Sequence, residues 1–193
     1  VEKIISKISG EYFKNYQINK IKSRDHGVDL YYGGNNEFFG YDKVIIATHA
    51  DEALAMIENP SDLEKETLSN FSYKKNTAYI HTDQSVMPEN KKAWCSWNSS
   101  MKKNEIEKNS ITYWLNLLQN LECEENIFLT LNPYFEIEES KILKKVKFTH
   151  PYFDQSALDY QSKLKNLQNK RNILFCGSYF GYGFHEDGIK SSI

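Results

Sequence analysis

Hydrophobic and polar residues alternate loosely over the first part of the chain. The alternation covers residues 11–23 and returns over 28–32 and 37–41, and glycine-containing turn signals separate these stretches at 25–27 and 33–36. This pattern predicts a β-meander. Its candidate core residues are Tyr12, Tyr16, Ile18 and Ile21.

A continuous apolar run, KVIIA, replaces the alternation at residues 43–47. A short run rich in β-branched residues is typical of a strand that is buried on both faces of a parallel sheet. Residues 51–57 then predict a helix. A second helix is expected over 62–70, because Ser61 can cap it and Glu64 completes a capping box.

Aromatic and β-branched stretches separated by polar turns dominate the middle of the chain. They predict an antiparallel sheet with strands at 76–83, 93–98, 110–118, 127–131 and 142–149. Residues 116–121 are the one ambiguous stretch, because they could form a helical turn instead.

The remainder of the chain predicts a helix and one more strand. Apolar residues near helical spacing indicate a helix over 154–169, and an apolar run at 173–176 indicates a strand. The expected fold class is therefore mixed α/β and α+β. Its expected domains are 1–71, an inserted antiparallel-sheet domain at 72–150, and a return to the first domain at 151–193.

Composition supports a folded protein and excludes some functions. Of the 193 residues, 40% are hydrophobic and 14% aromatic, which allows a sizeable core. The formal net charge of −2 gives no electrostatic reason to expect nucleic acid as a partner. Lysine pairs are expected on solvated surface: Lys91–Lys92, Lys102–Lys103 and Lys144–Lys145.

The cysteines and the longest apolar runs bear on location. Cys95, Cys123 and Cys176 are far apart and form no CxxC motif, so we expect neither a disulfide framework nor a zinc site, and a reducing, cytoplasmic compartment fits. No apolar run is long enough to span a bilayer, and no signal peptide pattern is visible.

The segment that carries the most chemistry is the C-terminal FCGSYFGYGFHEDGIKSSI. A strand leads to Gly177, and a helix is expected to start near Gly188 and to continue up to the last residue, Ile193. Strand, glycine turn and helix start are how α/β proteins hold a flat or phosphorylated cofactor. The alternative is a glycine-rich turn that only packs aromatic rings. Consecutive residues do not converge as metal ligands, so the acidic pair Glu186 and Asp187 is expected to cap the helix.

This segment resembles the C-terminal FAD signature of the flavin amine oxidase superfamily, and more closely a bacterial branch of predicted NAD/FAD-binding proteins. Other segments match that branch in order: YDKVIIATHADEAL, HTDQSVMP, AWCSWN, ITYWLNLLQ, FLTLNP and HPYF. The family begins with a glycine-rich GxGxxG fingerprint, and this chain contains no such motif. The resemblance therefore implies the C-terminal portion of a flavoprotein, cut at both ends, with a partial FAD-binding, Rossmann-like domain.

The resemblance implies FAD as cofactor and assigns residues to it. Gly177 and Ser178 would lie beneath its ribityl and phosphate part, although many amine oxidases have an acidic residue where this chain has Ser178. Amides near Gly188 and Ile189 would open a helix whose positive end stabilises reduced flavin by about 0.3–2 kcal/mol. The same segment includes Gly183, Phe184, His185, Glu186 and Asp187.

His185 has two possible roles in that segment, a hydrogen-bonding contact near the flavin or a packed turn residue. Two earlier positions are implied on the adenine and ribose side. Thr48 follows the buried strand, where ligands of α/β sheets bind, but Thr48 or Asp51 could equally cap the next helix. Ile18 would present its backbone to the adenine.

Candidate substrate-pocket residues are Trp97, Asn98, Tyr113 and Tyr182, because this superfamily places aromatic side chains around its substrate. Within 93–98, strand alternation would put Trp94 and Asn98 on the face opposite to Trp97. The alternative is core packing. His81 and His150 are candidate proton acceptors, with a structural role as the alternative, and no catalytic residue is assigned.

The implied activity is hydride transfer from a substrate to FAD by an oxidoreductase of amine-oxidase type. One alternative is a flavoprotein desaturase or isomerase that acts on a lipid-related substrate, since some relatives of this branch are associated with cyclopropane fatty acid synthases. The other is a non-catalytic fragment that cannot hold FAD alone. The expected partners are a small amine or lipid-related substrate and the missing N-terminal half of the enzyme, and the isolated chain is expected to be inactive.

Overall fold

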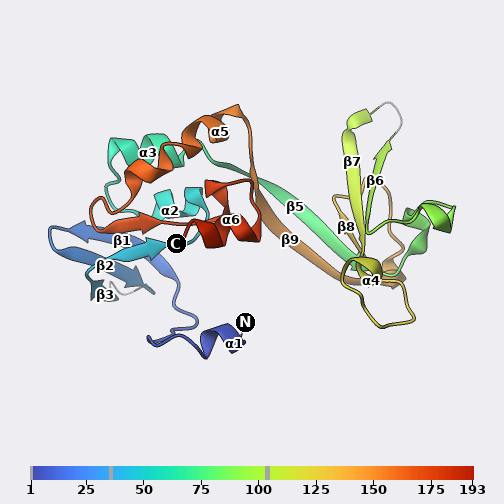
Figure 1. The fold of residues 1–193 in the computed structure, drawn as a ribbon, viewed down its shortest axis with the longest axis horizontal. Helices are drawn as coiled ribbons and strands as arrows, with labels where there is room; N and C mark the ends of the chain where they lie inside the picture. The colour runs from blue at the N-terminus through green and yellow to red at the C-terminus, as the bar shows by residue number, and fades with distance from the viewer. Residues whose placement is uncertain (1, 35–36, 103–104) are drawn as a thin grey trace. The chain divides into compact units, whose positions relative to one another are not determined.

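The computed structural model describes residues 2–34, 37–102 and 105–193. It divides into two compact units (Figure 1). Unit 1 contains the residues up to 72 together with 151–193, and unit 2 contains 73–150. The predicted hairpin residues Asn35 and Asn36 and the lysine pair Lys102–Lys103 lie outside the part whose side chains are described.

Unit 1 contains an antiparallel three-stranded meander, which confirms the expected one. Its strands are β1 (Ile18–Arg24), β2 (Gly27–Tyr32) and β3 (Glu37–Tyr41), in the order β1-β2-β3. Ile21 is buried as expected, but Tyr12 and Tyr16 are 53% and 45% exposed, so their assignment to the core was wrong. They lie before the first strand, where the alternation of a strand does not apply.

A short parallel pair of strands stands beside this meander. Strand β4 (Val44–Ile46) pairs with β10 (Ile173–Phe175), although the two are far apart in sequence. Ile46 is buried, whereas Ile45 is 63% exposed. The expectation that β4 is buried on both faces was therefore wrong, because no described segment covers the face to which Ile45 points.

Helices α2 (Ala50–Met56) and α3 (Asp62–Leu68) follow β4. The Ser61 capping box of α3 is confirmed, since Glu64 accepts a hydrogen bond from the Ser61 N–H at 2.6 Å. Helix α2 is capped by His49, whose N–H donates to the Glu52 carboxylate at 3.2 Å. Thr48 does not cap it, because its hydroxyl donates to the His49 carbonyl. Asp51 lies in the first turn rather than at the cap position, and its carboxylate accepts the Glu52 N–H at 2.9 Å.

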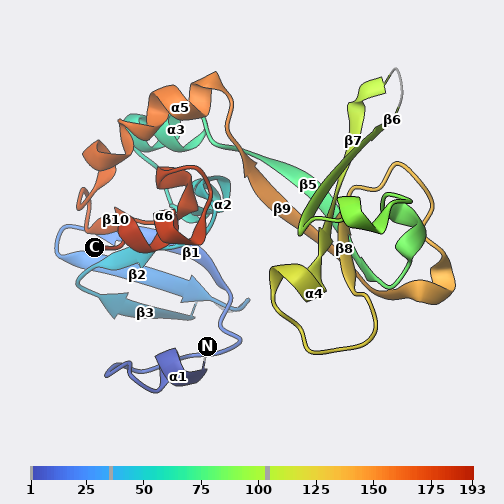
Figure 2. The same ribbon diagram turned by 45° about the vertical axis from the view of Figure 1, so that its right-hand side comes forward.

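The helix expected over 154–169 is split into two pieces. These are α5 (Gln155–Gln161), which starts after its cap Asp154, and the 3₁₀ turn η4 (Leu164–Leu167). Figure 2 shows α2, α3 and α5 grouped on one side of unit 1 and the meander on the other. The core beneath the helices includes Leu68, Ala157, Leu164, Leu167 and Tyr179.

Unit 2 is a five-stranded sheet in the order β6-β7-β8-β5-β9. Its strands are β5 (Ser72–His81), β6 (Trp97–Lys102), β7 (Glu105–Trp114), β8 (Phe128–Leu131) and β9 (Ile142–Tyr152). The antiparallel sheet confirms the expected fold class, and its pairings of β6 with β7, β7 with β8 and β5 with β8 are all antiparallel.

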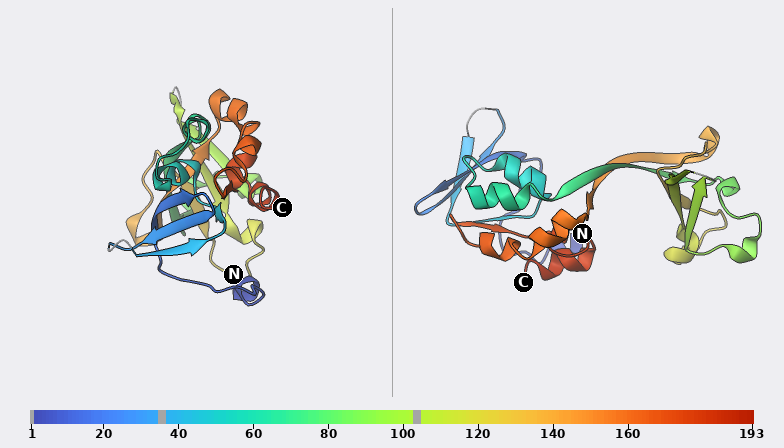
Figure 3. Two further views of the ribbon diagram at one scale, coloured as in Figure 1. Left: turned by 90° about the vertical axis from the view of Figure 1, so that its left-hand side faces the viewer. Right: turned by 90° about the horizontal axis from the view of Figure 1, so that it is seen from above.

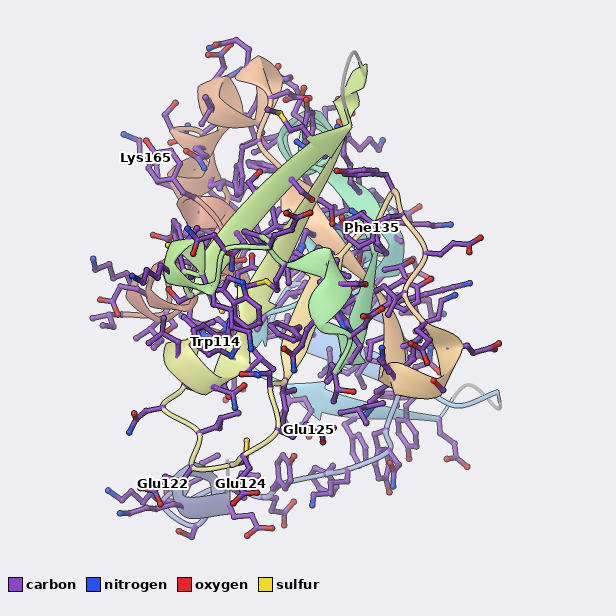
Figure 4. The ribbon with its side chains drawn as sticks, turned by 90° about the vertical axis from the view of Figure 1, so that its right-hand side faces the viewer. Trp114, Glu122, Glu124, Glu125, Phe135 and Lys165 are labelled. Carbon is purple, nitrogen blue, oxygen red and sulfur yellow. The ribbon has the colours of Figure 1, made fainter. Side chains whose placement is uncertain are left out.

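Several strand boundaries in unit 2 differ from the expected ones, and two of the differences have a local cause. The strand expected at 93–98 begins only at Trp97, because Asn90 caps a 3₁₀ turn, η2 (Lys91–Ala93), just before it. Strand β7 ends at Trp114 and the short helix α4 (Leu115–Leu118) follows, which is the helical alternative. Figure 4 shows Trp114 beside this helix and Glu122, Glu124 and Glu125 on the loop after it.

The remaining elements are short. They are α1 (Glu2–Ile5), η1 (Gln84–Val86), η3 (Glu139–Lys141), η5 (Ser178–Phe180) and α6 (His185–Lys190). Across the described ranges, no helix has both the length and the apolar character needed to cross a membrane.

Candidate functional site

A hollow of about 540 Å³ lies in unit 1 at the carboxyl ends of β4 and β10. Ala47 follows β4 and Cys176 follows β10, and the parallel pairing brings these two ends together. This is the edge of a parallel sheet at which α/β proteins bind ligands. The lining residues are Ala47, Cys176, Gly177, Ser178, Phe184, His185, Gly188, Ile189 and Ser192.

Gly177 is required at the turn beyond β10. Its φ is +155°, and a Cβ atom there would lie 2.6 Å from the Tyr179 ring, closer than carbon atoms approach. The Gly177 N–H donates to Ser191 Oγ at 2.9 Å, and that hydroxyl donates to the Gly188 carbonyl at 2.7 Å. Ser191 therefore ties the end of the strand to α6, and so it sets the distance between two walls of the hollow.

Helix α6 begins at His185, three residues before the expected start. The Asp187 carboxylate accepts hydrogen bonds from the N–H groups of Tyr182 and Phe184, at 2.9 and 3.0 Å, so the expected capping is confirmed for Asp187 but not for Glu186. Gly188 consequently lies inside the helix. The helix ends at Lys190 and does not continue to the end of the chain, since Ser191 is its C-cap.

The wall that α6 provides is apolar and open. Phe184 and Ile189 are 66% and 59% exposed, and His185 is exposed as well, so no other part of the described chain packs over it. A Cβ atom added to Gly188 would meet only the Ser178 nitrogen, at an ordinary contact distance of 3.7 Å. Burial raises the pKa of the Cys176 thiol, so this group is neutral at the floor of the hollow.

A second hollow, of about 400 Å³, lies between β4 and the meander. Ile18 and Thr48, the two residues expected on the adenine side, both line it. Ala47 lines this hollow and the first one, so the two adjoin at the end of β4. The other lining residues carry no charge: Tyr16, Gln17, Ile21, Leu30, Val44, Ile45, Ile46 and Met56.

Three predicted cofactor residues line neither hollow. Glu186 forms an exposed ion pair with Lys190 at 3.6 Å, and Asp187 is engaged in capping. Gly183 has a φ of +90°, and a Cβ atom there would lie 3.1 Å from the Phe153 ring. The positive φ and the close Phe153 ring explain why this position is a glycine, without a contact to a cofactor.

The predicted substrate-pocket residues do not form one group within a unit. Trp97 and Tyr113 are paired across β6 and β7 with ring centroids 4.9 Å apart, and Trp97 is 59% exposed. The side chain of Asn98 stabilises the turn at Cys95 through two hydrogen bonds. Its Nδ2 donates to the Cys95 carbonyl at 2.6 Å, and its Oδ1 accepts the Cys95 N–H at 3.1 Å. Tyr182 belongs to unit 1.

Trp94 lies before strand β6, so the expected alternation over 93–98 does not hold. Its ring packs edge-on against Trp114 and Phe128, and its Nε1–H donates to the Pro88 carbonyl at 2.7 Å. This supports the core-packing alternative for Trp94.

Several lining residues of the first hollow were not predicted from the sequence. Ala47 and Cys176 each follow a predicted strand, and that position was the only signal available for them. Ser192 and the linking Ser191 had none, because their roles depend on how α6 folds back onto β10. Among the described residues, no three His, Cys, Asp or Glu side chains lie together in a way that could hold a metal ion.

No family model and no curated protein sequence matches this chain. Solved structures do. A CLA-producing fatty acid isomerase from P. acnes is 14% identical with a TM-score of 0.65, over 99% of this chain and 49% of that one. A putrescine oxidase variant redesigned in cofactor binding is 10% identical with a TM-score of 0.63, over 98% and 49%. Cyclohexylamine oxidase from Brevibacterium oxydans is 8% identical with a TM-score of 0.59, over 91% and 46%.

These similarities concern the fold. The chain has the fold of the C-terminal part of amine-oxidase-like proteins, which confirms the expected fold class and agrees with the expected resemblance at the level of the fold. It spans about half the length of these solved structures.

Proposed function

We propose that this chain is the C-terminal part of an FAD-dependent oxidoreductase of amine-oxidase type, and that the hollow at the ends of β4 and β10 holds the flavin end of FAD. The observation that carries the proposal is this hollow, where Gly177, Ser178, Gly188 and Ile189 come together. The shared fold with two amine oxidases supports it.

The residues present fit a flat, largely apolar ring system. Phe184 and Ile189 offer exposed apolar surface, and Gly188 leaves the backbone open to close approach. Ser178 can donate a hydrogen bond, and the neutral Cys176 thiol places no charge beneath the ring. Bound FAD supplies the electron-accepting chemistry, and the chain orients it and keeps water from its face.

The phosphates of FAD require a contribution from outside this chain. The sequence has no GxGxxG motif, and the second hollow, where the adenine side was expected, is lined by no charged side chain. A glycine-rich turn at a helix N-terminus is the usual pyrophosphate site. We therefore assign the binding of the FAD phosphates to an N-terminal half of the same enzyme. The chain covers only 49% of the length of two similar solved structures, which supports this assignment.

The substrate of the whole enzyme is an amine or a lipid-related molecule. Fold similarity to putrescine and cyclohexylamine oxidases supports the first, and similarity to a fatty acid isomerase supports the second. A non-catalytic role for the chain is the remaining alternative, and it predicts that no flavin enters the first hollow.

Flavin titration tests the proposal. The purified chain is titrated with riboflavin and with FAD while flavin fluorescence is followed. We expect weak, saturable binding of both, with dissociation constants within about threefold of each other, because this chain holds the ring but not the phosphates. Binding of neither flavin at about 1 mM would contradict the proposed hollow. If FAD binds much more tightly than riboflavin, this chain itself binds the phosphates, which would contradict their assignment to another segment.

Two variants at one position provide the control. Gly188→Trp should abolish flavin binding because its side chain fills the hollow, whereas Gly188→Ala should retain it because the added Cβ makes only ordinary contact. Equal loss of binding in both variants, with unchanged thermal unfolding, would show that the flavin lies elsewhere.

A further inference from the structure

Strands β5 and β9 are neighbours in the sheet of unit 2 (Figure 3). The side chains of these two strands form a basic face. The two strands contain no acidic residue, and their lysines are Lys74, Lys75, Lys144, Lys145 and Lys147. The whole chain has a net charge of −2, so this local excess of positive charge is not a consequence of composition.

Alternation along each strand separates the lysines onto two faces. Asn76 Nδ2 lies 3.3 Å from His150 Nδ1, so these two side chains share a face. Residues at odd positions on both strands then point to the opposite face. That face holds Lys75 and Lys147, whereas Lys144 is on the Asn76 side.

The Lys75 and Lys147 face is hollowed. A cavity of about 470 Å³ is lined by Lys75, Asn76, Thr77, Lys147, Phe148 and Thr149, and no carboxylate is among them. Both lysines are exposed. Neither takes part in the ion pairs found among the residues that the structure describes. Two uncompensated ammonium groups repel each other across neighbouring strands, and an anion between them removes that repulsion.

The next lysine along the same face has a different environment. Lys145 Nζ lies 4.9 Å from the centre of the Tyr79 ring. It also lines a neighbouring hollow of about 570 Å³ together with Glu136, Glu138 and Phe135, which Figure 4 labels on the loop after β8. On this face, Lys75 and Lys147 are thus the lysines whose hollow is lined by no carboxylate, whereas the hollow beside Lys145 contains several.

We propose that Lys75 and Lys147, flanked by Thr77 and Thr149, bind the carboxylate or phosphate group of a small anionic ligand. Ammonium groups form charge-assisted hydrogen bonds to such oxygens, and a threonine hydroxyl can donate another. An aliphatic ammonium ion is repelled by the same hollow. The site lies wholly within unit 2, and it does not depend on flavin binding by unit 1.

Calorimetric titration of the whole, flavin-free chain tests this site with three probes: sodium octanoate, inorganic phosphate and octylammonium chloride. We expect saturable binding of an anion and none of octylammonium. Tighter binding of octanoate than of phosphate would identify an amphiphilic carboxylate as the ligand class, and the reverse order a free phosphate. The proposal would be overturned if neither octanoate nor phosphate binds saturably. It would also be overturned if octylammonium binds and displaces the anion.

Charge-neutralising variants locate the binding. The double variant Lys75→Gln, Lys147→Gln should weaken anion binding by about tenfold or more, since two ionic contacts are lost. Lys144 lies on β9 like Lys147, but on the other face of the sheet. Lys144→Gln should therefore change the affinity for the anion by less than about twofold in 0.15 M salt. Equal effects of the two substitutions would show a non-specific charge effect and would refute the site. All three positions are exposed, so thermal unfolding should be unchanged.

Discussion

At the scale of single residues, His81 is the side chain whose surroundings most constrain its role. It is fully buried at the end of β5, and its Nδ1 accepts the Asp83 N–H at 3.2 Å. Nε2 must then carry the proton, and it donates to Thr130 Oγ1 at 2.8 Å, which in turn lies 2.9 Å from Thr112 Oγ1. This hydrogen-bonded row crosses three strands of the sheet, and it supports the structural alternative for His81 over the proton acceptor.

The same burial makes stability depend on pH. Desolvation lowers the pKa of His81 in the folded chain below its ordinary value, although Asp83 opposes this. The unfolded chain therefore binds more protons just below pH 6.5, so stability is present above that pH and is lost as the pH falls. We expect urea unfolding to show a decrease of up to about 1.4 kcal/mol per pH unit below pH 6.5.

Two variants separate His81 from other groups. His81→Gln should remove this slope, whereas His150→Gln, on an exposed residue of the same sheet, should leave it in place. An unchanged slope in His81→Gln would refute the assignment. Asp83 does not interfere, because its pKa is lowered and its contribution is lost only at more acidic pH.

At the scale of secondary-structure elements, α6 is a six-residue helix held by its ends. Asp187 satisfies the N–H groups of Tyr182 and Phe184 at one end, and Ser191 links the other to Gly177. Gly181 is packed against the Asp187 carboxyl so closely that no Cβ atom fits there. A helix this short is not stable through propensity alone, so these bonds determine whether the first hollow has its second wall.

Removal of the Asp187 cap should therefore unfold α6 and open the hollow. We expect Asp187→Ala to cost about 1–2 kcal/mol of stability and to weaken riboflavin binding. Glu186→Ala, on the adjacent exposed residue, is the matched control and should leave both unchanged within error. Hydrogen exchange of the backbone amides in 182–190 would test whether α6 unfolds. If these amides are protected in Asp187→Ala as well as in the wild-type chain, the cap does not hold the helix.

At the scale of the whole molecule, unit 1 has a two-stranded parallel sheet in which one edge of β4 is unpaired among the described residues. Strand β4 has β10 as its one strand partner among the described residues, Ile45 is 63% exposed, and an apolar hollow lies beside it. An exposed apolar strand at a sheet edge is a surface for association with another chain. In the proposed enzyme, the N-terminal half would cover it.

The isolated chain should consequently self-associate through this edge. Sedimentation velocity is expected to show concentration-dependent oligomers, and Ile45→Lys should reduce them, because a charge at an open strand edge opposes pairing. Leu143→Lys replaces an equally exposed side chain, 59% exposed, in unit 2 and should have no effect. Equal reduction by both variants would show that association is not specific to β4.

Many of the elements could be predicted from local sequence. The meander, the Ser61 capping box of α3, the strands at 44–46 and 173–175 and most strands of the large sheet were expected, because each follows from residue patterns within a few positions. The start of α6 was not, since Asp187 caps the helix by reaching back to residues 182 and 184. The displacement of the strand at 93–98 has the same kind of cause, a local cap at Asn90 that the strand pattern hid.

By itself, the sequence determined the mixed fold class, the β-meander, the Ser61 capping box and the order of most strands. Only the tertiary structure decided that Ala47 and Cys176 share one hollow, that Ile45 is uncovered, and that Lys75 and Lys147 face the same cavity. The physical reason is that local patterns act through a few neighbouring residues, whereas these groupings depend on strand pairing between distant segments, which sequence periodicity does not specify.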